Sequence, residues 1–191
     1  MTVLTPANQI TLFRVLLIPA FVILVVYGYF GWALIVFVVA GATDLLDGLI
    51  ARTLSRRTDL GAWLDPVADK LLLVTTCIVL TIPGLGLVNR LPLWLTILII
   101  SRDILIVLTV AIINVAVGRR EFRPSIYGKI ATATYICTCV ILMYFNYLQQ
   151  SSRLVDVSIY ASLAITLISG FHYVVHATRI INQSEEGKES R

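Results

Sequence analysis

Four aspartates between positions 44 and 69 have the spacing of a metal site. Asp44 and Asp47 are three residues apart, and Asp65 and Asp69 are four apart. If both segments are helical, each pair shares one helix face, although the same residues would also suit solvated helix ends. Carboxylates that converge repel one another unless cations bind between them, and oxygen-only ligands favour Mg²⁺, Mn²⁺ or Ca²⁺. We therefore predict a divalent-metal site, in which two ions sharing carboxylates would clamp a diphosphate.

Small residues and an arginine separate the two aspartate pairs. Gly48, Ala51 and Gly61 would let a phosphate or a nucleotide approach the helix backbone closely. Close packing between helices explains the same three small residues equally well. Arg52 presents a planar fork of donors that matches diphosphate oxygens. These residues favour a phosphate-containing ligand beside the aspartates.

The composition indicates that these residues belong to a membrane protein. Of the 191 residues, 58% are hydrophobic and 14% are charged, with a mean hydropathy of +0.90, whereas about a quarter of a soluble domain is charged. A membrane span needs roughly 20 apolar residues, so the chain has room for about six. We expect an all-α integral membrane protein, with a short N-terminal juxtamembrane segment and six transmembrane helices at 11–30, 32–52, 61–81, 93–117, 126–148 and 157–181.

The chain is expected to form a single membrane domain over residues 1–181. The polar, charged segment 182–191 is predicted to be a disordered tail. The first apolar run lacks a small-residue cleavage site, so we expect the first helix to be retained.

Basic residues indicate how the helices are oriented. Lys and Arg are frequent in the links after the second and fourth spans and near both chain ends, whereas the opposite side has only Arg90 and Arg153. Because basic residues favour the cytoplasmic side, both termini and the aspartates should face the cytoplasm of a bacterial inner membrane. Orientation and anionic lipid also account for the net charge of +4 without a nucleic-acid partner.

One run of fixed positions resembles the signature of the CDP-alcohol phosphatidyltransferase family. The run matches that signature at every fixed position and reads Asp44-x2-Asp47-Gly48-x2-Ala51-Arg52-x8-Gly61-x3-Asp65-x3-Asp69. The N-terminal ANQITLFRVLLIPAF also resembles this family, and LDPVADKLLL is typical of its phosphatidylglycerophosphate synthases and cardiolipin synthases. The resemblance covers residues 4–180.

This resemblance implies a membrane enzyme that takes the phosphatidyl group from CDP-diacylglycerol. An alcohol would attack the β-phosphorus, and CMP would leave. Asp44, Asp47 and Asp65 would bind two divalent ions, Mg²⁺ or Mn²⁺. Asp69, near the second ion, would take the proton of the alcohol as general base. Such a protein would form a homodimer. The CDP moiety would be held by Asn8, Thr11, Arg14, Gly48, Ala51, Arg52 and Gly61.

Charged residues in the later spans are candidates for the acceptor site. Arg102 and Asp103 are the only charged residues inside the fourth predicted span, where they either neutralise each other or serve the acceptor. His172 and His176 share a helix face, and packing is the favoured interpretation for both. If the basic residues do serve the acceptor, its phosphate would be bound by Arg102, Lys129, Arg123 and Arg179.

Two acceptors agree with these residues. Basic side chains favour a phosphate-bearing alcohol, and the LDPVADK run favours glycerol 3-phosphate, which would give phosphatidylglycerophosphate. TDLLDG at 43–48 and ISRD at 100–103 instead resemble cardiolipin synthases, whose acceptor is phosphatidylglycerol. We favour glycerol 3-phosphate. The alternative from another class, an ion transporter or channel, leaves the pattern of Gly, Ala and Arg unexplained and predicts acidic residues at both membrane faces.

Overall fold

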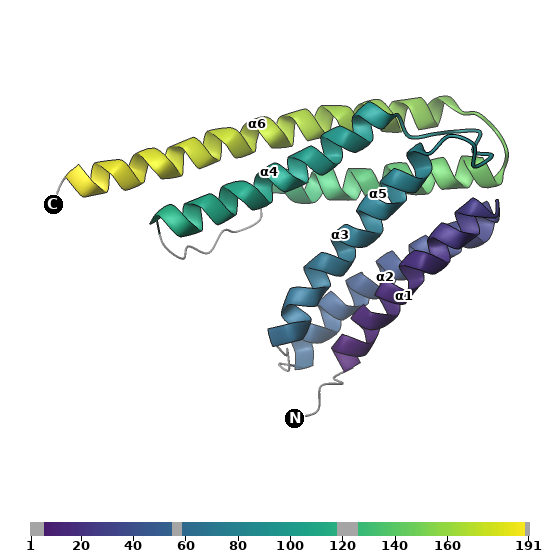
Figure 1. Ribbon diagram of the computed structural model, residues 1–191, viewed down its shortest axis with the longest axis horizontal. Helices are drawn as coiled ribbons and strands as arrows, with labels where there is room; N and C mark the ends of the chain where they lie inside the picture. The colour runs from purple at the N-terminus through teal and green to yellow at the C-terminus, as the bar shows by residue number, and fades with distance from the viewer. Residues whose placement is uncertain (1–5, 55–58, 118–125, 190–191) are drawn as a thin grey trace. The chain divides into compact units, whose positions relative to one another are not determined.

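Helices account for nearly all of the described chain. The computed structural model describes the backbone of residues 6–54, 59–117 and 126–189, and side chains at 12–43, 68, 70–109, 126–173 and 178. Within these ranges the chain has six helices (Figure 1). They are α1 (Pro6–Val26), α2 (Phe30–Leu54), α3 (Asp59–Thr81), α4 (Leu93–Val117), α5 (Ile126–Tyr147) and α6 (Arg153–Glu189).

The helices follow the predicted segments closely over most of the chain. α2 continues without a break through the stretch that contains its aspartate pair, and α4 has the bounds predicted for the fourth segment. The segment 82–92, rich in Gly and Pro, separates α3 from α4. There Gly84 and Gly86 have φ angles of 88° and 69°, in the left-handed region that glycine tolerates best.

The bounds of α1 and α6 differ most from those the sequence predicts: α1 ends at Val26 rather than at residue 30, and α6 begins at Arg153 rather than at residue 157. α1 begins at Pro6 rather than at residue 11, because proline suits the first turn of a helix. α6 continues to Glu189 and so includes residues 182–189, for which composition predicts disorder. The Gln, Glu and Lys residues of that segment are good helix formers, which accounts for the continuation beyond the apolar part. Residues 190–191 lie outside the described chain.

Two segments of the described chain are long and apolar enough to cross a membrane. They are Ile126–Tyr147, with a mean hydropathy of 1.5, and Arg153–Tyr173, with 1.7. Shorter apolar segments occur within α1, α2 and α3 at Leu12–Val26, Phe30–Thr43 and Lys70–Thr81. Most side chains in the remaining turns of these three helices are outside the described set. The all-helical architecture is therefore confirmed, and the number of spans stays a prediction.

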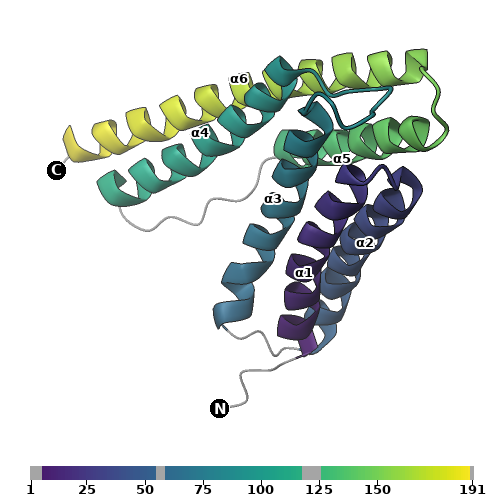
Figure 2. The ribbon, with the colours of Figure 1, turned by 45° about the vertical axis from the view of Figure 1, so that its right-hand side comes forward.

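The chain divides into two compact units. The first consists of Met1–Leu91 and Cys139–Val155, and the second of Pro92–Thr138 and Asp156–Arg191. In the first unit α1 packs against α2 and α3. The ring centroids of Phe21 on α1 and Phe37 on α2 are 6.0 Å apart. Figure 1 and Figure 2 both show the beginning of α1, the end of α2 and the beginning of α3 at the same end of this unit.

Buried amides attach the segment 82–92 to the end of α5 within the first unit. The backbone N–H of Asn89 donates to Oδ1 of Asn146 at 2.8 Å, and Nδ2 of Asn146 donates to the Asn89 carbonyl at 2.8 Å. Nδ2 of Asn89 donates to the carbonyl of Gln150 at 2.7 Å. Asn146 is fully buried. Because buried backbone groups outside helices need internal hydrogen-bond partners, this side chain stabilises the link between α3 and α4.

Candidate functional site

Both aspartate pairs lie on helices, as their spacing predicts. Asp44 and Asp47 belong to α2, and Asp65 and Asp69 belong to α3. Each pair therefore shares one helix face by backbone register. The four carboxylates themselves lie outside the described side chains, as do the side chains of the other motif residues on these helices, Gly48, Ala51, Arg52 and Gly61. Metal coordination by the aspartates stays a prediction.

The backbone places the two aspartate pairs at matching heights. α2 ends at Leu54 and α3 begins at Asp59, and these helix ends lie at one end of the first unit (Figure 2). At 1.5 Å per residue, Asp47 is about 10 Å from the end of α2 and Asp65 about 9 Å from the start of α3. Asp44 and Asp69 are each about 15 Å from those ends. Two levels of paired aspartates on adjacent helices are suited to binding two cations.

Arg14 lies at the same end of the unit and is fully buried. It is about 12 Å from the start of α1, close to the height of the aspartates on α2 and α3. Phe21 and Val25 follow at seven and eleven residues on the same face of α1 and are also buried, so this face is directed into the unit. A buried guanidinium needs anionic or polar surroundings. Asn8 and Thr11 occupy earlier turns of α1, and their side chains lie outside the described set.

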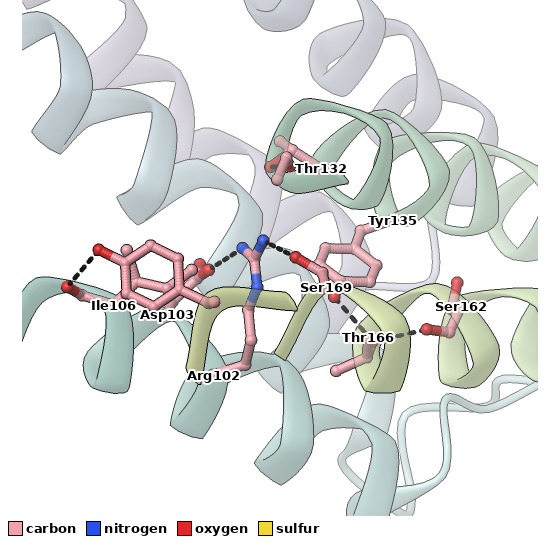
Figure 3. A network of polar contacts seen from close by, with 10 residues as sticks. Arg102, Asp103, Ile106, Thr132, Tyr135, Ser162, Thr166 and Ser169 are labelled. Carbon is pink, nitrogen blue, oxygen red and sulfur yellow. Dashed lines mark hydrogen bonds and ion pairs between the residues drawn. The ribbon is translucent and has the colours of Figure 1, made fainter. Parts of the chain in front are cut away.

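Arg102 is the best-defined charged residue of the second unit. Its side chain is 7% exposed. Nη1 donates to Oδ1 of Asp103 at 2.8 Å, and Nη2 donates to Oγ of Ser169 on α6 at 2.5 Å (Figure 3). The ion pair with Asp103 is the contact expected from mutual neutralisation, one of the two interpretations that the sequence left open. The contact with Ser169 was not predicted.

Hydrogen bonds establish the register of α4 against α6 in the second unit. Arg102 bonds Ser169, and the hydroxyl of Tyr173 donates to the carbonyl of Ile106 at 3.4 Å. Both pairs are separated by 67 residues. The constant offset shows that the two helices run parallel, and both views place them side by side (Figure 1, Figure 2).

A second set of contacts joins α5 to α6 in the antiparallel sense. The hydroxyls of Tyr135 and Thr166 are 2.7 Å apart, and those of Thr138 and Ser162 are 2.8 Å apart. Thr138 also donates to the carbonyl of Ser158 at 3.1 Å. Sequence reasoning missed this network. The spacing of Ser and Thr along the sixth apolar segment was the available signal, because residues at these intervals share one helix face that small polar groups can use for packing.

The α4–α6 and α5–α6 contacts together place two of the predicted acceptor residues, Arg102 and Lys129, at nearly the same height along the helices. Extended from the Tyr135–Thr166 pair, the α5 register places Thr132 opposite Ser169, and Figure 3 shows Thr132 on the side toward which the Arg102 guanidinium points. Lys129 is three residues from Thr132, about 4.5 Å along the axis of α5, and its side chain is exposed.

Of the other two predicted acceptor residues, Arg179 lies at a different level by backbone register. Arg179 follows Ser169 by ten residues on α6, about 15 Å along the helix, and its side chain is outside the described set. Arg123 lies outside the described residues. The ring of His172 stacks on that of Tyr127 with centroids 4.5 Å apart, which agrees with a packing role.

Several bacterial proteins are similar to this chain over most of its length. A Mycobacterium tuberculosis protein named as a phosphatidylglycerophosphate synthase is 33% identical over 184 residues, which are 92% of this chain and 82% of that protein. The CDP-diacylglycerol–glycerol-3-phosphate 3-phosphatidyltransferase of Bacillus subtilis is 31% identical over 185 residues, 87% of this chain and 91% of that protein. The CMP-forming cardiolipin synthase of Streptomyces coelicolor is 34% identical over 139 residues, 68% of this chain and 60% of that protein.

The family signature seen in the sequence is confirmed at the level of the whole chain. The sequence model for CDP-alcohol phosphatidyltransferases matches residues 4–171, which include α1 to α5, the first half of α6 and parts of both units. The chain belongs to the CDP-alcohol phosphatidyltransferase family and is an enzyme of phosphatidyl transfer.

Proposed function

We propose that the protein transfers the phosphatidyl group of CDP-diacylglycerol to glycerol 3-phosphate, giving phosphatidylglycerophosphate and CMP. One observation supports this acceptor most directly. Two relatives named for phosphatidylglycerophosphate synthesis or for glycerol 3-phosphate match 92% and 87% of this chain, whereas the cardiolipin synthase of Streptomyces coelicolor matches 68%. Family membership favours the enzyme over the ion-conduction hypothesis.

The first unit has the residues suited to the donor. Divalent ions held by Asp44, Asp47 and Asp65 would polarise the phosphoryl oxygens and neutralise their charge, and Mg²⁺ or Mn²⁺ suits such an all-oxygen site. The matching heights of the two aspartate pairs fit this assignment. Arg14 would bind an oxygen of the CDP diphosphate, with Asn8, Thr11, Gly48, Ala51, Arg52 and Gly61 as further CDP-binding residues.

Asp69 would remove the proton from the attacking hydroxyl. It lies one turn beyond Asp65 on α3, so it is near the phosphoryl group while its own carboxylate can accept a proton. The acceptor oxygen then bonds to the β-phosphorus, the bond from that phosphorus to the bridging oxygen breaks, and CMP leaves with the electron pair.

The second unit has the residues suited to the acceptor. Arg102 and Lys129 lie at one level by helix register, and together they would bind the phosphate of the acceptor. Arg123 and Arg179 are further candidates for binding that phosphate.

The membrane arrangement follows from the same set of observations. We infer that all six helices cross the bacterial inner membrane with both termini in the cytoplasm, because most basic residues lie at that side. CDP-diacylglycerol and the product are membrane lipids, so the reaction takes place at the surface of the inner leaflet. We also infer a homodimer, as the family resemblance implies.

An acceptor assay tests the proposed function. Purified protein is given CDP-diacylglycerol and Mg²⁺ or Mn²⁺, and release of CMP is followed with glycerol 3-phosphate, phosphatidylglycerol, inositol phosphate or serine offered separately. We expect CMP with glycerol 3-phosphate. Release with phosphatidylglycerol alone would instead identify a cardiolipin synthase, the candidate favoured by the Streptomyces coelicolor relative. No CMP with any acceptor would refute both assignments.

A further inference from the structure

The guanidinium of Arg102 has more donors than its contacts use. An arginine offers five N–H groups. Asp103 accepts one from Nη1, and Ser169 accepts one from Nη2. Nε is buried and has no hydrogen-bond partner among the described residues. Since buried polar groups are almost always paired, this side chain is prepared for a ligand that accepts hydrogen bonds.

The unused donors are of the chemical type that binds oxyanions. Guanidinium groups bind phosphate through two neighbouring N–H groups on one edge of the fork. The orientation of that edge depends on the two contacts that hold the fork. Asp103 is the next residue on the same helix, whereas Ser169 comes from α6 and is 1% exposed. Ser169 is therefore the contact that fixes Arg102 relative to a second helix.

We propose that Ser169 is a positioning residue for the phosphate of the acceptor. Its hydroxyl holds the Arg102 fork so that the donors left by Asp103 and Ser169 bind the acceptor phosphate. This inference rests on the proposed function, in which Arg102 and Lys129 bind that phosphate. Ser169 acts through Arg102, so its loss should weaken binding of the acceptor and leave binding of CDP-diacylglycerol unchanged.

The other hydroxyls of α6 provide a matched comparison. Ser162 lies on the same side of the helix and is also buried, but its hydroxyl bonds Thr138 of α5. Removing the Ser162 hydroxyl breaks a contact between helices without touching Arg102. A general effect of loosening α6 would therefore occur in both serine variants, and a positioning effect would occur in one.

Steady-state kinetics of the full-length protein test the proposal. Ser169→Ala, Arg102→Lys, the double variant and the control Ser162→Ala are compared, with KM measured for glycerol 3-phosphate and for CDP-diacylglycerol. We expect Ser169→Ala to raise KM for glycerol 3-phosphate by about tenfold, because it removes one hydrogen bond to a charged group, and to leave KM for CDP-diacylglycerol unchanged. The double variant should bind the acceptor no worse than Arg102→Lys, since both changes act on the same group.

Three results would overturn the proposal. They are an equal rise of both KM values in Ser169→Ala, additive effects in the double variant, and a Ser162→Ala variant that behaves like Ser169→Ala. If Ser169→Ala does not fold, Ser169→Thr is used in its place, because it keeps the hydroxyl. Its KM for the acceptor should equal that of the wild type, and a raised acceptor KM in Ser169→Thr would count against the proposal.

Failure of the proposed function is distinguishable from failure of this inference. If the wild type uses phosphatidylglycerol and not glycerol 3-phosphate, the same variants are measured with phosphatidylglycerol, which also contains a phosphate. If the wild type releases no CMP with either alcohol, calorimetric binding of glycerol 3-phosphate decides. Equal affinity of wild type and Ser169→Ala would then overturn the role of Ser169, and a loss of about tenfold would support it.

Discussion

Replacing Asn146 by alanine should destabilise the first unit strongly. The substitution removes the acceptor of the Asn89 N–H and the donor to the Asn89 carbonyl, two bonds of 2.8 Å. Leaving one buried polar group unpaired costs about 1–3 kcal/mol, so two cost about 2–6 kcal/mol. The neighbouring Arg90 is exposed, which indicates that water reaches this segment and that the lower half of the range applies. At roughly 2–4 °C per kcal/mol, Tm should fall by about 5–15 °C.

Two neighbouring substitutions should lower the stability less than Asn146→Ala does. Asn89→Ala removes the single side-chain bond to the Gln150 carbonyl and keeps both backbone bonds with Asn146, so its cost should be about 1 kcal/mol. Gln150→Ala is the control, because Gln150 takes part through its backbone carbonyl and its side chain is exposed. The expected order of melting temperatures is therefore control highest, Asn89→Ala next and Asn146→Ala lowest.

A thiol-reactive fluorescent dye measures these melting temperatures in detergent. Cys77 and Cys139 are buried in the first unit and become reactive when it unfolds. Cys137 is exposed and is replaced by alanine in every variant to remove its background signal. If Asn146→Ala melted together with Gln150→Ala, the amide bonds would contribute nothing to stability, and the reasoning from unpaired buried groups would be wrong for this protein.

Three further predictions concern the chemistry and the packing of the first unit. Asp69→Asn should abolish turnover and still bind CDP-diacylglycerol in an equilibrium binding assay, and full activity would remove Asp69 as the base. EDTA should abolish CMP release, with recovery on adding Mg²⁺ or Mn²⁺, whereas activity that persisted in EDTA would refute the metal site. Gly31→Ala should lower stability by about 1 kcal/mol, because its Cβ would lie 2.8 Å from the Tyr147 ring. Gly41→Ala is the matched control, since its Cβ would meet nothing within 4 Å, and equal melting of the two variants would contradict the predicted clash.

The helices could be predicted because each depends mainly on local signals. The bounds of α4 agree with prediction since the segment 82–92 ends the preceding helix with Gly and Pro, and an uninterrupted apolar run follows. The helical location of the four aspartates could be predicted for the same reason, while their role as metal ligands stays a prediction. The continuation of α6 to Glu189 was missed because the segment is polar, and low hydrophobicity resembles disorder even where helix propensity is good.

Contacts between helices could not be predicted, since sequence spacing contains no register. Ser169 is 67 residues from Arg102, and nothing in the apolar segments distinguishes it from the other serines of α6. The same limitation affects Asn89 and Asn146, which are 57 residues apart and read from the sequence as two isolated polar residues. The role of each of these residues follows from its hydrogen-bond partner, and the partner is known only once the chain is folded.

The register between α4, α5 and α6 also indicates which of the predicted cations lie at the same height along the helices. The sequence makes Arg102 and Lys129 the main candidates and Arg179 a further one, but it does not give their relative heights, because the register between the helices is unknown. The hydrogen bonds of α6 establish this register by placing Arg102 and Lys129 at one level and Arg179 about 15 Å further along. Of Arg102 and Lys129, Arg102 already forms an ion pair with Asp103, so the orientation of its guanidinium fork should matter for binding a phosphate at that level.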